Sequence, residues 1–165
     1  MRVAVTSPGY VALVLAHALC GLIGFGALAT TGAYAEAVRR HSDPFSSPSL
    51  RRFFKPGHNL ASATILAVPL LGGGLLLAQH GRDAHLLYPW LGLGFWSFAA
   101  VTAVAVVWPA EQQLQRLLEA DDVATRGIGD RSPAQLRAVA RRCTAGATLT
   151  TLCFVAALIV MVGQP

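Results

Sequence analysis

The chain has 165 residues, of which 54% are apolar and only 13% are charged, and its mean hydropathy is +0.52. Soluble domains carry about 25% charged residues, so this composition excludes an ordinary soluble domain and predicts a polytopic membrane protein with one domain, residues 1–165. In a membrane protein, the net charge of +5 is interpreted from the positions of the arginines along the chain. We therefore do not take it as a sign of nucleic-acid binding and expect no nucleic-acid partner.

Four segments are candidates to cross a membrane. A hydrocarbon core of about 30 Å needs roughly 20 apolar residues in a helix, and residues 10–34, 59–79, 88–108 and 143–162 meet that requirement. Aromatic residues stand at or near the span ends, as interfacial anchors do: Tyr10, Tyr34, Tyr88, Trp90 and Trp108. The sequence therefore predicts an all-α membrane protein, a four-transmembrane-helix bundle.

The first span has one competing interpretation. Ala33-Tyr34-Ala35 has the small-x-small form of a signal-peptide cleavage site. However, the apolar stretch is longer than a typical signal, and arginines follow it rather than precede it. A first helix that runs from outside to inside fits these features better.

The connection after the first span ends in a helix start. Pro56 disfavours helical geometry at Lys55, and Asn59 is a preferred N-cap residue. We expect the nearby cations to meet anionic lipid headgroups, while Phe53 and Phe54 dip toward the acyl boundary. His58 is interpreted as an interfacial residue at this helix start rather than as a ligand.

The remaining helices carry their own signals. In the second, Pro69 followed by glycines 72–74 predicts a kinked, loosened outer half, either as a hinge or as glycine-permitted packing. The third continues past Trp108, because residues 114, 117 and 118 form a leucine stripe. A capping-box pattern, Ser132-Pro133-Ala134-Gln135, starts the fourth near Pro133. Helices three and four thus extend into the cytoplasm.

Orientation follows from the cations. The first and third connections, with their helix extensions, hold eleven of the thirteen, against only Arg2 and Arg82 on the other side. The positive-inside rule then predicts both termini outside (N-out/C-out) and the long connections in the cytoplasm. We expect headgroup contacts from seven of these cations: Arg39, Arg40, Arg51, Arg52, Lys55, Arg141 and Arg142.

The predicted spans contain no carboxylate, arginine or lysine, which argues against a proton-coupled carrier. Their one histidine is His17, about 10 Å below the outer surface at 1.5 Å per residue. Cys20, Ser97 and Cys153 lie at comparable depths of roughly 13–15 Å. His17 and the two cysteines are soft or borderline ligands that suit copper(I).

A simpler interpretation of this layer is structural. His17 would stay neutral and hydrogen-bond Ser97 or a backbone carbonyl, and the cysteines would only pack. Ala16, Cys20 and Gly24 recur every fourth residue, a spacing that permits close approach of another helix.

Several of these features resemble a known family. Leu15-Ala16-His17 and Gly24-Phe25-Gly26 in the first helix are followed by the pairs Arg39-Arg40 and Arg51-Arg52, then by Trp108-Pro109-Ala110 and Arg141-Arg142. The chain resembles a bacterial family of four-helix predicted integral membrane proteins of unknown function, and is remotely similar to the copper-resistance D proteins. It departs from the latter in lacking Trp-Gly-Gly after the first histidine, which argues against copper transport. The resemblance implies a four-helix bundle.

Three hypotheses of function remain. The first is a non-enzymatic accessory or assembly component of a membrane complex, acting through its membrane-protein partner or as a homo-oligomer. The second is a copper- or haem-handling protein that uses His17 with Cys20 and Cys153, and the third is a small uncoupled permease. The arginine bias, with Lys55 the one lysine, is typical of a high-GC bacterial genome, so we expect a bacterial cytoplasmic (inner) membrane location.

Overall fold

The computed structural model describes residues 7–42, 47–55, 60–78, 85–124 and 133–163, with the backbone alone for 120–124. These residues form helices and no strand. Four helical stretches are long and apolar enough to cross a membrane, and they are Pro8–Arg40, Leu60–Ala78, Leu87–Glu119 and Pro133–Val162. The prediction of an all-α chain with four candidate spans is confirmed, apart from residues 59 and 79, which lie outside the described residues.

The first span is one continuous helix, α1 (Pro8–Arg40). Ser7 caps it by accepting a hydrogen bond from the Tyr10 backbone N–H (3.3 Å), and Pro8 occupies the first turn, where no N–H is needed. With 33 residues it is about 50 Å long, more than the roughly 30 Å of a hydrocarbon core. The helix is therefore longer than a crossing requires, and its charged last turns are not needed to span the apolar layer.

The second span is broken into three pieces: α3 (Leu60–Ala63), the 3₁₀ turn η2 (Thr64–Ala67) and α4 (Val68–Ala78). Pro69 has no N–H to donate to the Ile65 carbonyl, and the chain tightens into the 3₁₀ turn directly before it. Close packing is present as well, since a Cβ added to Gly72 would lie 3.2 Å from Cε1 of His17. The predicted break is present directly before Pro69, whereas the outer half that was expected to be kinked is the regular helix α4.

The third span joins α5 (Leu87–Thr102), the π-helical turn η3 (Ala103–Val107) and α6 (Trp108–Ala124). In the π turn, the Trp108 N–H bonds the carbonyl of Ala103, five residues earlier. This wider turn stands directly before Pro109, whose ring would otherwise clash with the carbonyl four residues back. The predicted continuation of this helix past Trp108 is confirmed.

The fourth span is α7 (Pro133–Val162), which begins at Pro133 as predicted. The connection after α1 contains a short helix that the sequence did not indicate, α2 (Pro48–Phe53). There Phe53 stacks on Tyr34 with ring centroids 3.8 Å apart, and Phe54 is 1% exposed. The prediction that Phe54 faces the acyl boundary is wrong, because this ring is buried in protein, whereas Phe53 is half-buried against Tyr34.

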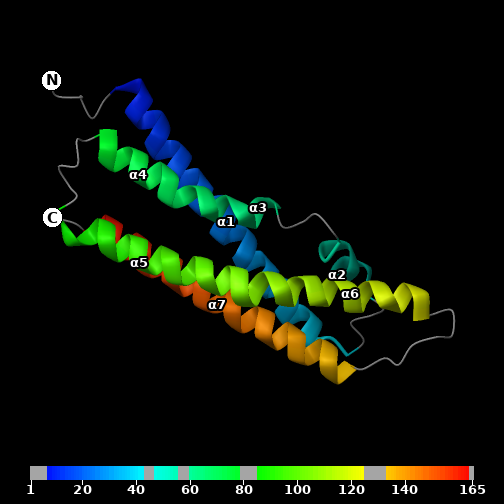
Figure 1. Cartoon of the computed structure of the whole chain (residues 1–165). Coiled ribbons are helices and arrows are strands. Elements are labelled where there is room, and N and C mark those ends of the chain that lie inside the picture. Colours follow the sequence, from blue (N-terminus) through cyan, green and yellow to red (C-terminus); the bar gives the residue numbers. More distant parts are fainter. Residues whose placement is uncertain (1–6, 43–46, 56–59, 79–84, 125–132, 164–165) are drawn as a thin grey trace.

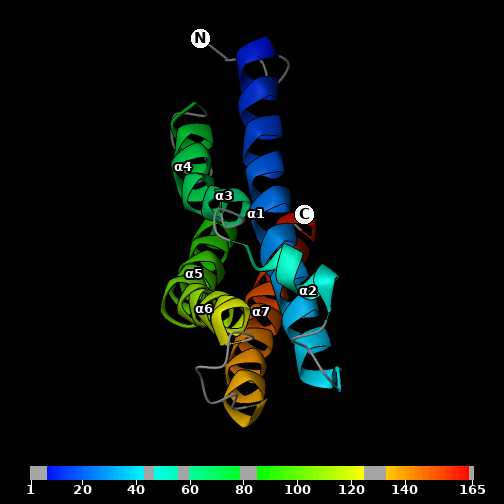
Figure 2. The ribbon, with the colours of Figure 1, turned by 90° about the vertical axis from the view of Figure 1, so that its right-hand side faces the viewer.

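The helices form two pairs that meet in the middle of the molecule (Figures 1 and 2). One pair is α1 with α4 and the other is α5 with α7, and α1 also crosses α7 in the most extensive contact of the fold. We call the end with the start of α1, the end of α4, the start of α5 and the end of α7 the terminal end. The opposite end, with α2, α6, the last turns of α1 and the first turns of α7, is the basic end.

The two ends are packed differently. At the basic end, apolar side chains of four helices are buried together, and they include Val38, Leu50, Phe54, Leu114, Leu118, Leu136 and Val139. Toward the terminal end the pairs diverge (Figure 1), no extensive contact joins α4 to α5 within the described residues, and α4 contains no buried residue. The core therefore lies at the basic end and in the middle of the bundle.

Candidate functional site

His17 is half-buried on α1 and faces α4. Its Nδ1 lies 3.0 Å from the carbonyl oxygen of Val68, in the turn that precedes Pro69. A carbonyl can only accept, so Nδ1 carries the proton in this hydrogen bond. Of the two hydrogen-bond partners considered for a neutral His17, Ser97 or a backbone carbonyl, the structure has the carbonyl.

The other residues predicted around His17 are dispersed. Ser97 is exposed on α5. The carbonyl of Cys20 accepts a hydrogen bond from the Thr64 hydroxyl (3.1 Å), and Cys153 packs against the core from α7. Within the described residues, no three His, Cys, Asp or Glu side chains are grouped as metal ligands would be. His58 and His80 lie outside those residues, and His85 is exposed.

Within the described residues this donor set does not form a metal site with three protein ligands. One imidazole with a backbone-bound Nδ1–H has the tautomer of many metal-ligating histidines, but the described residues bring no second and third ligand to it. A metal held by His17, Cys20 and Cys153 stays a prediction. What the arrangement does show is a side chain that bonds the backbone beside a proline break.

A second side chain has a similar role, and the sequence analysis missed it. Pro69 cannot donate to the carbonyl of Ile65, which instead accepts from the Val68 backbone N–H in the 3₁₀ turn and from the indole N–H of Trp96 (2.8 Å). The indole of Trp108 donates to the hydroxyl of Ser62 (3.0 Å). These two bonds attach the second span to the third. The missed signal was the spacing of four residues that joins Pro69 to Ile65.

Glycines of α1 allow its backbone to approach the second span and α7 closely. A Cβ added to Gly24 would lie 2.7 Å from the backbone nitrogen of Ile65, and one added to Gly32 would lie 2.6 Å from Cβ of Ala147. Phe25 and Phe154 stack between these points, with ring centroids 4.5 Å apart. The predicted close approach along the small-residue face of α1 is present at Gly24.

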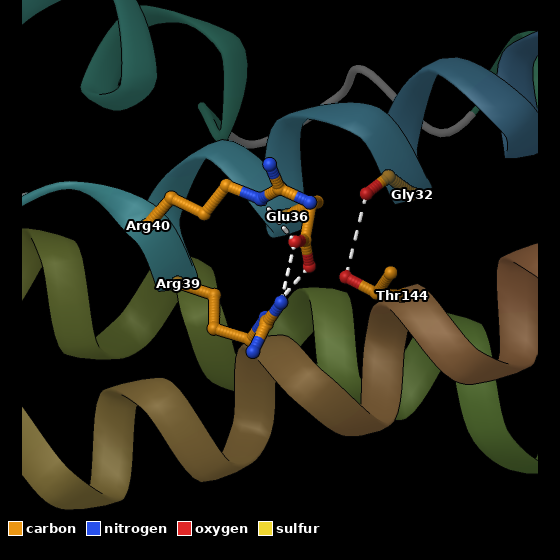
Figure 3. A network of polar contacts seen from close by, with 5 residues as sticks. All are labelled: Gly32, Glu36, Arg39, Arg40 and Thr144. Atoms are coloured by element: carbon orange, nitrogen blue, oxygen red, sulfur yellow. Dashed lines mark hydrogen bonds and ion pairs between the residues drawn. The ribbon is translucent and has the colours of Figure 1, made fainter.

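All nine cations whose side chains the structure describes belong to the basic end: Arg39, Arg40, Arg51, Arg52, Lys55, Arg116, Arg137, Arg141 and Arg142. Glu36 lies between Arg39 and Arg40 on α1, with nitrogen–oxygen distances of 2.6 Å and 2.5 Å (Figure 3). Hydrogen bonds from Arg39 and then Arg40 lower the pKa of Glu36 from 4.5 to about 2. Glu36 is therefore ionised throughout the physiological range and partly neutralises its two neighbours.

The buried carboxylate of Glu111 is the other feature that the sequence analysis did not find. Glu111 is 1% exposed in the first turn of α6, close enough to Cys143 of α7 to interact electrostatically. It lies three and seven residues before the buried Leu114 and Leu118, on the same face of the helix. Its position on that leucine stripe could have indicated its burial.

Beside the ion pairs of Glu36, α1 and α7 border an open groove of about 360 Å³. Its walls are formed by small residues, three threonines, one leucine and one carboxylate: Ala29, Gly32, Ala33, Glu36, Thr144, Ala147, Thr148, Thr151 and Leu152. Comparison of the chain with family models, with curated proteins and with solved structures finds no match. Its function must therefore be argued from these surfaces.

Proposed function

We propose that this protein is a non-enzymatic accessory or assembly component of a complex in the bacterial cytoplasmic membrane, with both termini outside and the basic end in the cytoplasm. The observation that carries the proposal is the incomplete closure of the bundle at the terminal end. There α4 rests on α1 and α5 rests on α7, without an extensive contact between the two pairs in the described residues.

Large apolar side chains border this open half. On the pair α1 and α4 they include Val11, Leu15, Leu19, Leu70 and Leu77, and on the pair α5 and α7 they include Leu87, Trp90, Ile159 and Val162. Lipid tails are as apolar as these side chains, so apolarity alone does not favour a protein partner. The favouring feature is geometric, because the two helix pairs make no extensive contact with each other at this end within the described residues.

The second span adds to this support. Beyond Pro69, α4 contains three glycines and no buried residue. Gly73 has open space around the position where a Cβ would stand, and small residues allow another transmembrane helix to approach closely. A partner helix between the pairs would bury surface on α4 and α5 that the isolated chain leaves exposed.

The test is site-specific photo-crosslinking in the native membrane. A benzophenone amino acid replaces Leu77 at the end of α4 or Leu87 at the start of α5, which are 80% and 71% exposed. Val104 in η3, also exposed, is the matched control outside the opening. We expect adducts of one discrete, larger mass from the first two positions and none from Val104.

Two results would contradict the proposal. Adducts with lipid alone at all three positions would mean that only the bilayer contacts the open half. An adduct with the mass of two copies of this chain would indicate a homo-oligomer instead of an accessory subunit. Because the labelled positions lie on different helices, misfolding of one variant would not affect the result from the other.

A further inference from the structure

The groove between α1 and α7 combines small apolar residues, threonines and one glutamate. It is bordered by small residues of α1 (Ala29, Gly32 and Ala33) and by threonines of α7 (Thr144, Thr148 and Thr151). It runs from the middle of the molecule toward the basic end, where Glu36 borders it (Figure 3). The groove therefore joins an apolar stretch to a charged end.

Two of the three threonines make the groove less polar than its sequence suggests. The Thr144 hydroxyl lies 3.4 Å from the carbonyl of Gly32, and the Thr151 hydroxyl donates to the carbonyl of Ala147 (2.8 Å). Because these two hydroxyls already bond to backbone carbonyls, they do not need hydrogen bonds from a ligand in the groove. An apolar chain suits such walls.

Helical spacing places cations at the charged end of the groove. On α1, Arg40 follows Glu36 by four residues and Ala33 by seven, so it continues the same face. On α7, Arg141 precedes Thr144 by three residues and Thr148 by seven. Both arginines are exposed.

Arg137 and Arg39 belong to the same end of the groove. Arg137 precedes Arg141 by one helical turn, and Arg39 shares the carboxylate of Glu36 with Arg40. Four arginines thus stand against one carboxylate, and that carboxylate stays ionised because its pKa is lowered to about 2. The net charge of this end is +3, from four positive and one negative side chain.

We propose that the groove binds one anionic phospholipid molecule, with an acyl chain along the small residues and threonines and the phosphate among Arg39, Arg40 and Arg141. The apolar walls and the excess positive charge complement the two parts of such a lipid. A helix with its side chains is about 10–12 Å across, which a groove of about 360 Å³ does not enclose. This site lies away from the terminal end, so the proposal goes beyond the proposed function and does not depend on it.

The site also differs from general attraction of the basic end to a negative surface. General attraction would involve every exposed cation, with a contribution set by distance from the membrane. A built site depends on the arginines of the groove face and on the shape of the groove. Variants that change the arginines or the shape of the groove therefore distinguish a specific lipid site from general electrostatic attraction.

The test uses the intact chain in detergent, titrated with phosphatidylglycerol and followed by native mass spectrometry, which counts bound lipids. We expect one molecule to bind with higher affinity than any further ones, and phosphatidylcholine of the same chain length to bind more weakly. Glycerol 3-phosphate, a headgroup without acyl chains, should not bind measurably.

Three variants sharpen the test. Arg141→Gln should weaken the first binding step by about fivefold, the effect of about one lost cation near a charged surface. Thr148→Leu, at an exposed position, should block the groove and remove the preferred site. Arg116→Gln, an exposed arginine of α6 outside the groove, should leave the first step unchanged.

Each opposite result overturns the proposal. Equal loss from Arg141→Gln and Arg116→Gln would mean diffuse electrostatic attraction. Equal affinity for phosphatidylglycerol and phosphatidylcholine would mean that the arginines do not select the headgroup. Binding that survives Thr148→Leu would place the lipid elsewhere, and a co-purified peptide in the groove would identify a partner helix as its occupant.

Discussion

At the basic end, four helices bury Val38, Leu50, Phe54, Leu114 and Leu136 almost completely, whereas at the terminal end α4 buries none of its residues. The two ends also differ in the polarity of the side chains on their surface. The first turns of α7 and much of α6 carry charged and amide side chains that are exposed, so the apolar residues beneath them are shielded from water. Burial there gains free energy from the hydrophobic effect.

The terminal half lies within the apolar stretches, where lipid tails offer side chains an equally apolar environment. Association of helices there depends on close packing and on hydrogen bonds. The structure has both at the edge of this half, in the contact of Gly24 with η2 and in the bonds that His17 and Trp96 make to the carbonyls around Pro69. One chain thus uses two sources of stability, divided along its length.

The largest effect is expected from a leucine-to-alanine substitution, which we compare at the basic end and in the terminal half. Leu136→Ala at the basic end should lower the free energy of unfolding by about 2–5 kcal/mol, because Leu136 is fully buried. Leu70→Ala in α4, where the side chain is 78% exposed, should change it by less than about 0.5 kcal/mol. Unfolding in mixed micelles, followed by circular dichroism, measures both. Equal losses would mean that the terminal half is packed as tightly as the basic end.

A smaller effect is expected from the bond that repairs the proline break. Trp96→Phe removes the indole donor to Ile65 and should lower the free energy of unfolding by about 1 kcal/mol. In a Pro69→Ala background the backbone N–H of residue 69 can donate to that carbonyl in addition to the Val68 N–H, so the same change should cost less. The unfolding free energies of the four proteins in this double-mutant cycle give the coupling directly.

The control for this cycle is Trp108→Phe, since Trp108 donates to Ser62 rather than to the proline break. Its effect should be the same with either residue at position 69. If Pro69→Ala relieved both tryptophan variants equally, the benefit would come from a stiffer α4 and not from the Ile65 carbonyl.

Much of this fold could be predicted from the sequence. The helix start at Pro133, the helical continuation past Trp108 and the break beside Pro69 follow from local signals, and each is present in the structure, although Ser132 of the predicted capping box lies outside the described residues. The concentration of cations in two connections likewise predicts that these connections share one end. These features depend on residues that are close in sequence, so they can be predicted without knowing which helices pack against one another.

The packing partners could not be predicted in the same way. Inside a membrane both lipid and core are apolar, so hydrophobicity does not indicate which face of a helix turns inward. Ser97 was expected beside His17 and is exposed, while Trp96, its neighbour in sequence, makes the inward bond. Phe54 shows the converse at the basic end, where a ring expected in lipid is buried by a short helix that had no clear signal.

The smallest expected effect concerns the pH dependence of the basic end. Glu36 has a pKa of about 2 in the folded protein, against an ordinary value of 4.5, because Arg39 and Arg40 donate hydrogen bonds to it. A lowered folded pKa means that these bonds stabilise fully above about pH 4.5 and that the stabilisation is lost as the pH falls toward 2. Stability should therefore decrease over this range by more in the wild type than in Glu36→Gln. The difference should be small, since the side chains of Arg39 and Arg40 are 44% and 75% exposed.

Unfolding in mixed micelles between pH 5 and pH 2.5 provides the measurement, with Glu119→Gln, an exposed glutamate of α6, as the matched control. The control should keep the wild-type slope, because it leaves Glu36 and both arginines in place. Identical slopes for Glu36→Gln and the wild type would mean that the ion pair adds nothing to folding. The basic end would then owe its stability to apolar burial alone, and the arginines beside the groove would be held by no carboxylate. The difference in stability between the two ends would in that case come from apolar packing, with no contribution from the ion pairs of Glu36.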